Sequence, residues 1–460
     1  MPPSRSPARA AVLVVIAVLV CSAAPTMSPH VPGAVGNGRT RLPTGWYLSP
    51  AGTQIGVGDF PLGLAVSPDG ALAAVTNSGW HAKSLDLVGL KAGARTQSVP
   101  LRDSWLGVTF IAGGAGLAVT EGHENRVLLF AIDGGRAVLR DSIAIGPPWS
   151  AGGQYPQGKV IDYGPGAIWT TGLASDDQHR RLYVVSRLDS ALSVVDLEPR
   201  RVRARLRLPG VPYTCIVTPD GERVLVSLWS SASVAVVNAR TLTVERVIPA
   251  AAHPTDMAVT GDSRTLFVGC ANENIVCVLD LENGTPVERL RTARDPDEPA
   301  GLTPNALTLD PDNRRLYVAN AGGNHVAVFD VSRPGHSRAV GFIPTGWYPT
   351  ALRWIHGRGS FVVANGKGLG SAPSRGGDTD TSSWCRYVSY SPNARGALSI
   401  VQAPDDALLA KLTKQVFADT PPLRPRPKSR PPIQHVFYII KENRTYDQVL
   451  GDMTQGDGDP

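Results

Sequence analysis

Cysteine is scarce in this sequence, and several short motifs that mark common catalytic centres are missing. The 460 residues include five cysteines, none in a C-x-x-C-H haem motif or in the paired C-x-x-C motifs of zinc sites. A G-x-S-x-G nucleophile motif and a P-loop are also missing. The sequence therefore gives no support for covalently attached haem, a zinc ribbon, an α/β-hydrolase serine nucleophile or a P-loop nucleotide site.

The net positive charge is low over the body of the chain, residues 31–420. The net charge of +6 includes +2 from Arg5 and Arg9, +4 from residues 421–432 and −3 from residues 433–460, which leaves +3 for residues 31–420. The sequence pI of about 9.1 thus reflects local clusters. A nearly neutral body predicts no nucleic-acid partner.

The long apolar stretch nearest the N-terminus, residues 10–20, is too short to cross a bilayer by itself. It follows a basic start and precedes small residues, which is the layout of a secretory signal peptide. We expect a signal peptide over residues 1–24 with cleavage after Ala23. The mature protein would be secreted or periplasmic, with no transmembrane helix after signal removal. Lipid attachment at Cys21 and an uncleaved membrane anchor are the alternatives.

Glycine (48) and proline (39) are plentiful, and they punctuate an internal repeat. Seven segments share one pattern and begin at Phe60, Ser104, Trp169, Val211, His253, Thr303 and Tyr348. Their second residues are 44, 65, 42, 42, 50 and 45 positions apart. This regularity indicates a repeat architecture with two insertions.

Each repeat predicts four strands. An alternating apolar run leads into a Pro-Asp-Gly or Pro-Asp-Asn turn, and a second run, a polar hairpin and two further runs follow. Four strands in 40 to 50 residues are typical of a β-propeller blade, whereas an open β-solenoid has shorter rungs. We predict an all-β fold, a seven-bladed β-propeller over residues 42–417.

The residues before the first repeat predict how the ring closes. Residues 42–58 can donate the outer strand of the last blade, which would remove an exposed sheet edge. Their PTGWY sequence recurs as Pro344–Tyr348, so we expect the same chain corner at both ends of the ring.

Other notable residues have structural interpretations. Cys270 and Cys277 flank a predicted hairpin, and we interpret them as two separate buried thiols, with a disulfide as the alternative. The run Gly366–Gly370 is interpreted as a turn, and the nine tryptophans as mostly blade-packing residues. Five histidines near blade turns occupy different places in the repeat, which argues against one metal cluster: His81, His123, His179, His253 and His325. No cofactor is predicted for the propeller.

The chain changes character near its C-terminal end. Residues 418–432 hold six prolines and four basic residues, which predicts a semi-extended linker. Residues 436–440 are continuously apolar, as in a strand buried on both faces. Glu442 and Asn443 come directly after this run, and their oxygens suit a hard divalent cation, or zinc in a mixed site. Thr445 can cap a short helix that follows.

These motifs resemble two known families. The strand ends YVAN, YVVS and VVAN, with the Pro-Asp-Gly turns, resemble the YVTN-type seven-bladed propeller repeats of secreted bacterial proteins over about residues 42–416. Residues 433–460 resemble the first strand and metal loop of the phosphoesterase family in the alkaline-phosphatase superfamily, because Glu442 to Asp447 match the motif E-N-R-[ST]-[FY]-D. The resemblance implies that Glu442 and Asn443 are metal ligands and that Asp447 orients the loop.

The phosphoesterase resemblance also implies a Ser or Thr nucleophile and further Asp and His ligands, which residues 433–460 do not supply. These 28 residues cannot bury a core of their own. We therefore expect the 460-residue chain to be catalytically inert, with no catalytic residue assigned in it. The metal ion, of unassigned identity, and a phosphoester substrate would belong to the complete domain.

Three functions follow from these observations. The first is a secreted, metal-dependent phosphoester hydrolase whose propeller recruits the substrate or a partner. The second is an extracellular propeller that acts alone as a scaffold for a protein or small-molecule ligand. The third is a propeller that is itself an enzyme of the lactonase or quinoprotein type. The third would need three or more acidic or histidine side chains around one point of the channel, and the sequence offers no such constellation.

Overall fold

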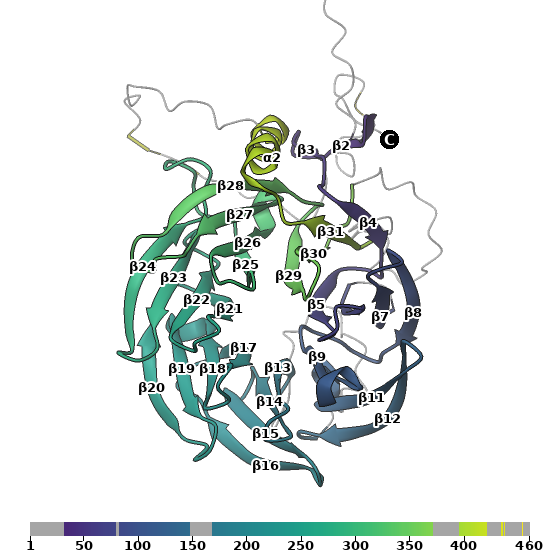
Figure 1. Cartoon of the computed structure of the whole chain (residues 1–460), viewed down its shortest axis with the longest axis vertical. Helices are drawn as coiled ribbons and strands as arrows, with labels where there is room; N and C mark the ends of the chain where they lie inside the picture. Colours follow the sequence, from purple (N-terminus) through teal and green to yellow (C-terminus); the bar gives the residue numbers. More distant parts are fainter. Residues whose placement is uncertain are drawn as a thin grey trace, which may run out of the picture. The chain divides into compact units, whose positions relative to one another are not determined.

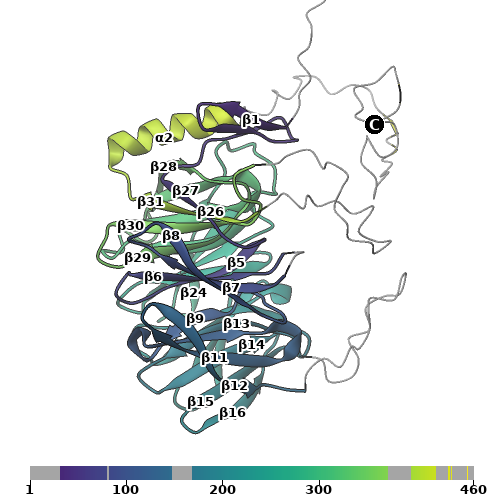
Figure 2. The same cartoon turned by 90° about the vertical axis from the view of Figure 1, so that its right-hand side faces the viewer.

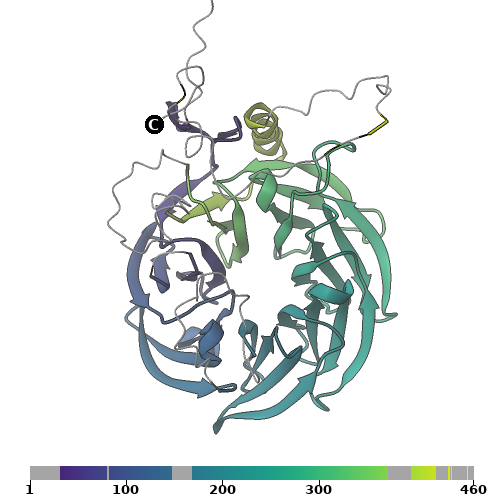
Figure 3. The ribbon, with the colours of Figure 1, turned by 180° about the vertical axis from the view of Figure 1, so that it is seen from behind.

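The computed structural model describes residues 32–79, 82–147, 168–370 and 395–420, together with residues 434, 435, 437 and 453. Within these residues, the strands form seven four-stranded antiparallel sheets and one three-stranded sheet. The seven sheets are arranged as blades around a common axis (Figures 1 and 3). This is the seven-bladed β-propeller that the repeat predicted, and each sequence copy supplies one blade.

The blades are numbered along the chain, and each begins with the strand nearest the axis. The strands are: blade 1, β5 (Pro61–Val66), β6 (Leu72–Asn77), β7 (Ser84–Gly89) and β8 (Ala94–Pro100); blade 2, β9 (Val108–Ile111), β10 (Gly116–Thr120), β11 (Arg126–Asp133) and β12 (Arg136–Ala144); blade 3, β13 (Thr170–Asp176), β14 (Arg181–Ser186), β15 (Ala191–Leu197) and β16 (Arg200–Arg207); blade 4, β17 (Pro212–Val217), β18 (Arg223–Leu228), β19 (Ser233–Asn238) and β20 (Val244–Pro249).

The remaining strands complete the ring and a small separate sheet. They are: blade 5, β21 (Pro254–Val259), β22 (Thr265–Cys270), β23 (Ile275–Asp280) and β24 (Thr285–Arg291); blade 6, β25 (Pro304–Leu309), β26 (Arg315–Asn320), β27 (His325–Asp330) and β28 (Arg338–Pro344); blade 7, β29 (Pro349–Ile355), β30 (Ser360–Asn365), β31 (Ala397–Gln402) and β4 (Thr53–Gly56); separate sheet, β1 (Gly33–Gly36), β2 (Arg39–Arg41) and β3 (Tyr47–Leu48).

The middle strands are apolar on both faces because each blade is covered by a neighbour on either side. In β14, Leu182 and Val184 pack in the cluster shared with blade 2, whereas Tyr183 and Val185 pack in the cluster shared with blade 4. The alternation follows from the two-residue period of a strand. It also explains why these strands are continuous apolar runs. The outer strand β16, RRVRARLR, instead alternates exposed and half-buried residues.

Strand β4 closes the ring as the outer strand of blade 7 (Figure 1). It is antiparallel to β31, with Gly56 opposite Ala397. Ile55 of β4 is buried in the cluster between blades 7 and 1. The prediction that residues 42–58 donate this strand is confirmed. The first and last blades are thereby joined by backbone hydrogen bonds and by a shared core.

The two PTGWY sequences do not form the same corner, so that prediction is wrong. Pro344–Tyr348 connects β28 to β29, and Pro349 pairs with the end of β30. Residues 43–46 instead lie in the turn between β2 and β3, and Tyr47 begins β3 opposite Arg41. The same pentapeptide folds differently because different strands receive the residues that follow it.

A helix outside the blades precedes the predicted linker. Helix α2 (Asp406–Asp419) begins at Asp405, whose side chain accepts a hydrogen bond from the Leu408 N–H. It packs along β28, and Figure 2 shows α2 and β1 at one edge of the ring. The helix takes in Ala418 and Asp419, the first two residues of the predicted linker. Among the described residues, no helix has the length and apolar character needed to cross a bilayer.

The end of α2 is held by a buried polar cluster, here called the exit clamp. It consists of Arg39, Ser49, Arg294, Glu298, Asp419 and Thr420. Asp419 is 3% exposed and accepts hydrogen bonds from Arg39 Nη2 (3.0 Å) and from the Ser49 hydroxyl. Arg294 pairs with Glu298 and donates to the Thr420 carbonyl at 2.9 Å. The clamp therefore ties the N-terminal sheet, the loop after β24 and the helix end together.

Two cysteines of blade 5 face each other. Cys270 and Cys277 lie diagonally across the β22–β23 hairpin, and their Sγ atoms are 3.8 Å apart. Both are buried free thiols in this structure, which agrees with the interpretation of two separate thiols.

His325 gives a prediction for the pH dependence of stability. It is fully buried, its Nδ1–H donates to the Gly323 carbonyl and its Nε2 accepts from the Asn320 amide. Burial lowers the pKa of His325 to about 4, with Arg294 adding to the shift. The unfolded chain takes up this proton near pH 6.5, so stability should fall as the pH drops from about 6.5 to about 4, by up to about 3 kcal/mol.

Urea unfolding of the wild type and of His325→Gln at pH 7.5 and pH 4.5 measures this contribution. The stability difference between the two pH values should be about 2–3 kcal/mol smaller in the variant. The exposed His336→Gln is the matched substitution. Equal differences in wild type and His325→Gln would show that this histidine does not carry the effect.

Candidate functional site at the mouth of the central channel

The residues predicted to bind a metal lie outside the described residues. This holds for Glu442 and Asn443 and also for Thr445 and Asp447. Of the predicted buried strand 436–440, only Phe437 is described. It lies outside any strand and is 89% exposed, so the prediction of a buried strand residue is wrong at this position. Within the part of the chain that the structure describes, no group of three or more His, Cys, Asp or Glu side chains is placed to hold a metal ion. The candidate site described below is therefore the central channel of the propeller.

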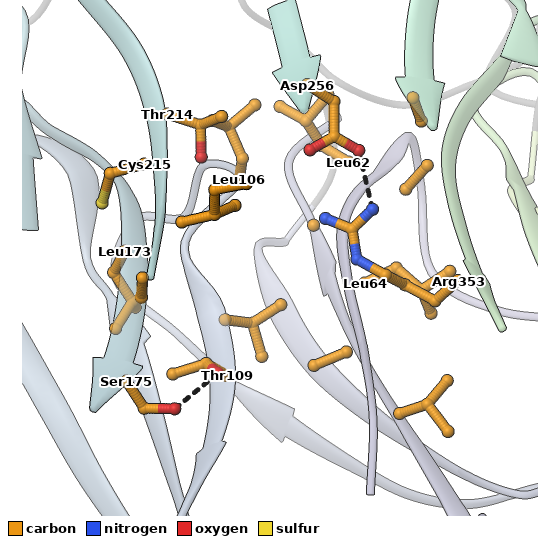
Figure 4. A pocket seen from close by; sticks show the side chains of 18 of the residues that line it. Leu62, Leu64, Leu106, Thr109, Leu173, Ser175, Thr214, Cys215, Asp256 and Arg353 are labelled. Atoms are coloured by element: carbon orange, nitrogen blue, oxygen red, sulfur yellow. Dashed lines mark hydrogen bonds and ion pairs between the residues drawn. The ribbon is translucent and has the colours of Figure 1, made fainter. Parts of the chain in front are cut away.

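The inner strands of the seven blades line a cavity of about 360 Å³ (Figure 4). Blades 1 to 3 contribute leucine side chains such as Leu106, together with Thr109 and Ser175, whose hydroxyl groups are hydrogen-bonded to each other. Blades 5 to 7 contribute polar side chains, including Asp256 and Arg353. The cavity thus combines apolar side chains with a few hydrogen-bonding groups, which is common in ligand pockets.

An ion pair crosses the channel. Arg353 Nη1 of blade 7 lies 2.7 Å from Asp256 Oδ2 of blade 5, so the pair passes over the inner strand of blade 6 (Figure 4). The same Asp256 oxygen accepts a hydrogen bond from the Leu307 N–H at 3.2 Å. The Asp256 side chain is only 9% exposed, so these partners compensate a buried carboxylate.

A second polar link crosses the channel nearer its opening. The Tyr213 hydroxyl of blade 4 donates to Asn305 Oδ1 of blade 6 at 3.2 Å, and Asn305 Nδ2 donates to the Thr350 carbonyl of blade 7 at 3.3 Å. Burial raises the pKa of Tyr213 above its usual value, Asp256 and Tyr348 raise it further, and Arg187 opposes the shift. Tyr213 is therefore a protonated donor at the top of the cavity.

All seven inner strands begin at one face, here called the channel mouth. The residue before the inner strand has a left-handed backbone in five blades, with φ from +46° to +61°: Phe60, Trp169, His253, Thr303 and Tyr348. In each of these blades, its carbonyl accepts a backbone hydrogen bond from the residue that follows the second strand. Bulky residues rarely adopt this conformation, and such strain clusters at functional sites.

Half-buried aromatic rings gather at this mouth. The Tyr213 and Trp229 rings are stacked with centroids 5.6 Å apart, and Trp229 lies 4.5 Å from the His253 ring. A second group surrounds Trp169, whose ring is 4.5 Å from that of His123 and 5.2 Å from that of Trp105. A third group pairs Tyr348 with Phe60 at 6.2 Å.

Two cations lie over these rings. The Arg187 guanidinium is 5.7 Å from the centre of the Trp169 ring. Lys367 Nζ is 5.1 Å from the rings of both Trp347 and Tyr348. Burial lowers the pKa of Lys367. Cation–π contacts of this kind hold a charged group at the surface of a ring while leaving it available to an anion.

On the side of the mouth formed by blades 1 and 2, the Asp103 carboxylate lies close to two basic side chains, His123 and Lys83. Asp103 Oδ2 accepts hydrogen bonds from the ring Nδ1 of His123 (2.7 Å) and from its backbone N–H (2.8 Å). Although burial acts to raise the pKa of Asp103, the bonds from His123 hold it below its usual value. Burial lowers the pKa of Lys83, against the opposing attraction of Asp103 and Asp59.

Sequence reasoning missed this mouth. The tryptophans are interpreted from the sequence as mostly blade-packing residues, and Trp354 does pack against Tyr317 and Phe361. Trp105, Trp169 and Trp229 also contact rings of neighbouring blades, but they are only half-buried and lie at the mouth. A signal was present, because an aromatic residue or histidine precedes proline at the start of three repeats, at Phe60, His253 and Tyr348. The run Gly366–Gly370 begins as the predicted turn, with residues 366–369 in turn conformation.

Comparisons with known proteins agree on the fold. No protein-family model matches the sequence. A solved structure of hydrazine synthase from Kuenenia stuttgartiensis is similar, with a TM-score of 0.55 and 18% identity, over 67% of this chain and 93% of that chain. At this identity the likeness concerns the fold alone. By its fold, this chain is therefore a multi-bladed β-propeller protein.

A curated 6-phosphogluconolactonase from Enterobacter sp. (strain 638) is 28% identical over 137 residues. The match covers 29% of this chain and 40% of that protein, so the chain spans less than half of the relative's length. Among the described residues that line the cavity, Asp256 is the one acidic side chain, and none is histidine. The described lining residues alone do not bring together the three acidic or histidine side chains that a propeller enzyme of the lactonase or quinoprotein type would need.

Proposed function

We propose that this chain is the propeller module of a secreted, metal-dependent phosphoesterase, and that the channel mouth recruits the substrate or a partner. The observation that carries the proposal is the match of Glu442 to Asp447 to the motif E-N-R-[ST]-[FY]-D, which is separated by nine residues from the proline-rich linker of residues 418–432. The YVTN-like strand ends of the repeats support the same architecture. The long insertion in blade 7, residues 366–398, also resembles a loop of the propellers that are fused to a phosphoesterase.

The donor set fits a divalent cation. Glu442 offers a carboxylate and Asn443 an amide oxygen, both suited to a hard metal ion or to zinc in a mixed site. A bound metal ion supplies charge stabilisation to the phosphoryl oxygens. The role of Glu442 and Asn443 is to hold that ion after the apolar run of residues 436–440, while the propeller holds the molecule to be processed.

The test uses the protein as it is made in its native source. Antibody raised to the propeller captures it, its intact mass is compared with 48.6 kDa, and hydrolysis of p-nitrophenyl phosphate and of bis(p-nitrophenyl) phosphate is measured with and without EDTA. We expect a heavier species with EDTA-sensitive activity. In the same gene, Glu442→Gln or Asn443→Ala should lower that activity by about 100-fold or more.

The matched control is Asp452→Asn, which lies outside the motif and should leave the rate unchanged. A captured protein without metal-dependent hydrolysis, or a Glu442→Gln variant with full activity, would overturn the proposal. The second candidate function, a propeller that acts alone as a binding scaffold, is favoured by the aromatic channel mouth. Ligand binding in a captured protein that lacks hydrolytic activity would select it.

A further inference from the structure

The channel mouth offers a row of three aromatic rings on blades 4 and 5, here called the platform. The Tyr213 and Trp229 rings are stacked at 5.6 Å and inclined by 21°, and the His253 ring lies 4.5 Å beyond Trp229, tilted by 52°. All three side chains are partly exposed. The C–H faces of a sugar ring pack on such surfaces, because stacking buries their apolar area while the hydroxyl groups remain at the ring edge, free to form hydrogen bonds.

Hydrogen-bonding groups adjoin this platform. The His253 Nδ1 atom is buried and has no hydrogen-bond partner among the described residues. The Tyr213 hydroxyl and the Asn305 amide lie at the top of a cavity of about 360 Å³. This volume lies within the range of about 300–1,000 Å³ that is usual for small-molecule pockets. The Tyr213 hydroxyl donates to Asn305 and keeps a lone pair, so it can accept a hydrogen bond from a hydroxyl group of a sugar stacked on the platform.

Two positive charges at the mouth have no carboxylate partner in the described part of the chain. Arg187 and Lys367 contact aromatic rings and form no ion pair there. The Arg187 backbone N–H donates to the Trp169 carbonyl at 3.1 Å, which places Arg187 at the mouth, on blade 3 beside blade 4. Arginine binds carboxylate and phosphate groups through its planar fork, and lysine binds them as a point charge. These residues would select a sugar that carries anionic groups.

The geometry points to an acidic-saccharide site at the channel mouth, in which Tyr213, Trp229 and His253 stack on sugar rings while Arg187 and Lys367 bind their carboxylate or phosphate groups. The inference deepens the proposed function, since it names the class of molecule that the propeller recruits. The left-handed backbone at His253 and Tyr348 is part of this arrangement, because it sets where their rings leave the chain.

A nucleic acid is the rival ligand, because single strands also stack on aromatic rings. Its backbone needs a basic groove along its length. The propeller carries a net charge of only +3 over residues 31–420, and Asp59, Asp103 and Asp256 lie at or below the mouth. The observations therefore favour a saccharide with discrete anionic groups.

The test is titration calorimetry of the 460-residue protein with four probes: an oligogalacturonate, a phosphomannan oligosaccharide, a neutral dextran oligosaccharide and a single-stranded DNA oligonucleotide. We expect at least one acidic saccharide to bind about tenfold or more tightly than the neutral one. The two acidic probes show whether carboxylate or phosphate is preferred.

The variants separate stacking from charge. Trp229→Ala should weaken saccharide binding about tenfold, whereas Trp229→Phe, which keeps a ring, should retain most of it. Arg187→Gln and Lys367→Gln should weaken the acidic probes toward the level of the neutral one. Lys411→Gln, on the exposed side of α2, is the matched charge control and should change nothing.

Three results would overturn the inference: no saccharide bound at millimolar concentration, DNA bound more tightly than every saccharide, or saccharide binding unchanged by Trp229→Ala. Thermal unfolding of each variant shows that its fold is retained. The readout is binding by the propeller, so it is independent of hydrolysis. Failure of the phosphoesterase proposal and failure of this site are therefore distinguishable.

Discussion

Replacing Ile55 by Asp is expected to open the propeller ring. Ile55 is 5% exposed, and it packs in the cluster where strand β4 joins blade 7 to blade 1. The substitution loses its apolar burial and places a carboxylate without a partner in that cluster. The combined cost is on the order of 5 kcal/mol, which is comparable to the whole stability of many proteins.

The expected consequence of Ile55→Asp extends beyond stability. Once β4 detaches, β31 becomes an exposed sheet edge, and such an edge pairs with other chains. Guanidinium unfolding should show a much lower midpoint, and size-exclusion chromatography should show oligomers or aggregates.

The matched control lies in the same strand. Thr53 is exposed, so Thr53→Asp introduces the same charge at a solvent-facing position and should change stability by about 0.5 kcal/mol or less. Similar unfolding midpoints for the two variants would mean that β4 is not what holds the ring closed.

The second large effect is expected for Arg294→Ala in the exit clamp. The side chains of Arg294 and Glu298 are only 6% and 7% exposed, and Arg294 also donates to the Thr420 carbonyl. Removing the guanidinium leaves the Glu298 carboxylate buried without its partner. Breaking a buried ion pair in this way costs about 3–5 kcal/mol. Chemical denaturation measures the loss.

Arg180→Ala is the control for Arg294→Ala. Arg180 pairs with Glu198, and both side chains are about two-thirds exposed, at 65% and 64%. A solvent-exposed pair contributes little, so this variant should unfold close to the wild type. If the two variants were equally destabilised, burial of the Arg294–Glu298 pair would not be the cause. Limited proteolysis after Thr420 should in addition be faster only in Arg294→Ala, since the clamp holds the helix end.

Much of the fold was predictable because each blade is a local unit. Its four strands are consecutive in the chain, so strand periodicity and turn residues within 40 to 50 positions define it. The closing strand was also predictable, since seven copies of a four-strand unit starting at Phe60 leave the last blade one strand short. Helix α2 and the sheet of β1 to β3 were not predicted, because contacts with blade 6 and with the exit clamp stabilise them rather than any repeat.

The candidate functional residues were less predictable from the sequence than the fold. The roles of Glu442 and Asn443 stay predictions from a motif, because those residues lie outside the described part of the chain. The channel mouth was hidden in the sequence, since Trp169, Trp229 and Tyr348 belong to blades 3, 4 and 7 and come to the same face only when the ring closes. These tryptophans were interpreted as packing residues because residue type alone does not show which strand ends lie at the channel mouth.

The sequence by itself determined the blade count, the strand order within each blade and the strand that closes the ring, because these depend on short-range periodicity and on turn chemistry repeated seven times. Only the tertiary structure decided which aromatic and charged residues share the channel mouth, and that the second PTGWY, unlike the first, leads into an inner strand. The reason is physical. Contacts around the axis join residues far apart in the chain, such as Tyr213 and Asn305, which are 92 positions apart, or Pro61 and Thr350, which are 289 apart. A side chain's exposure likewise depends on neighbours from other blades, which no local pattern identifies.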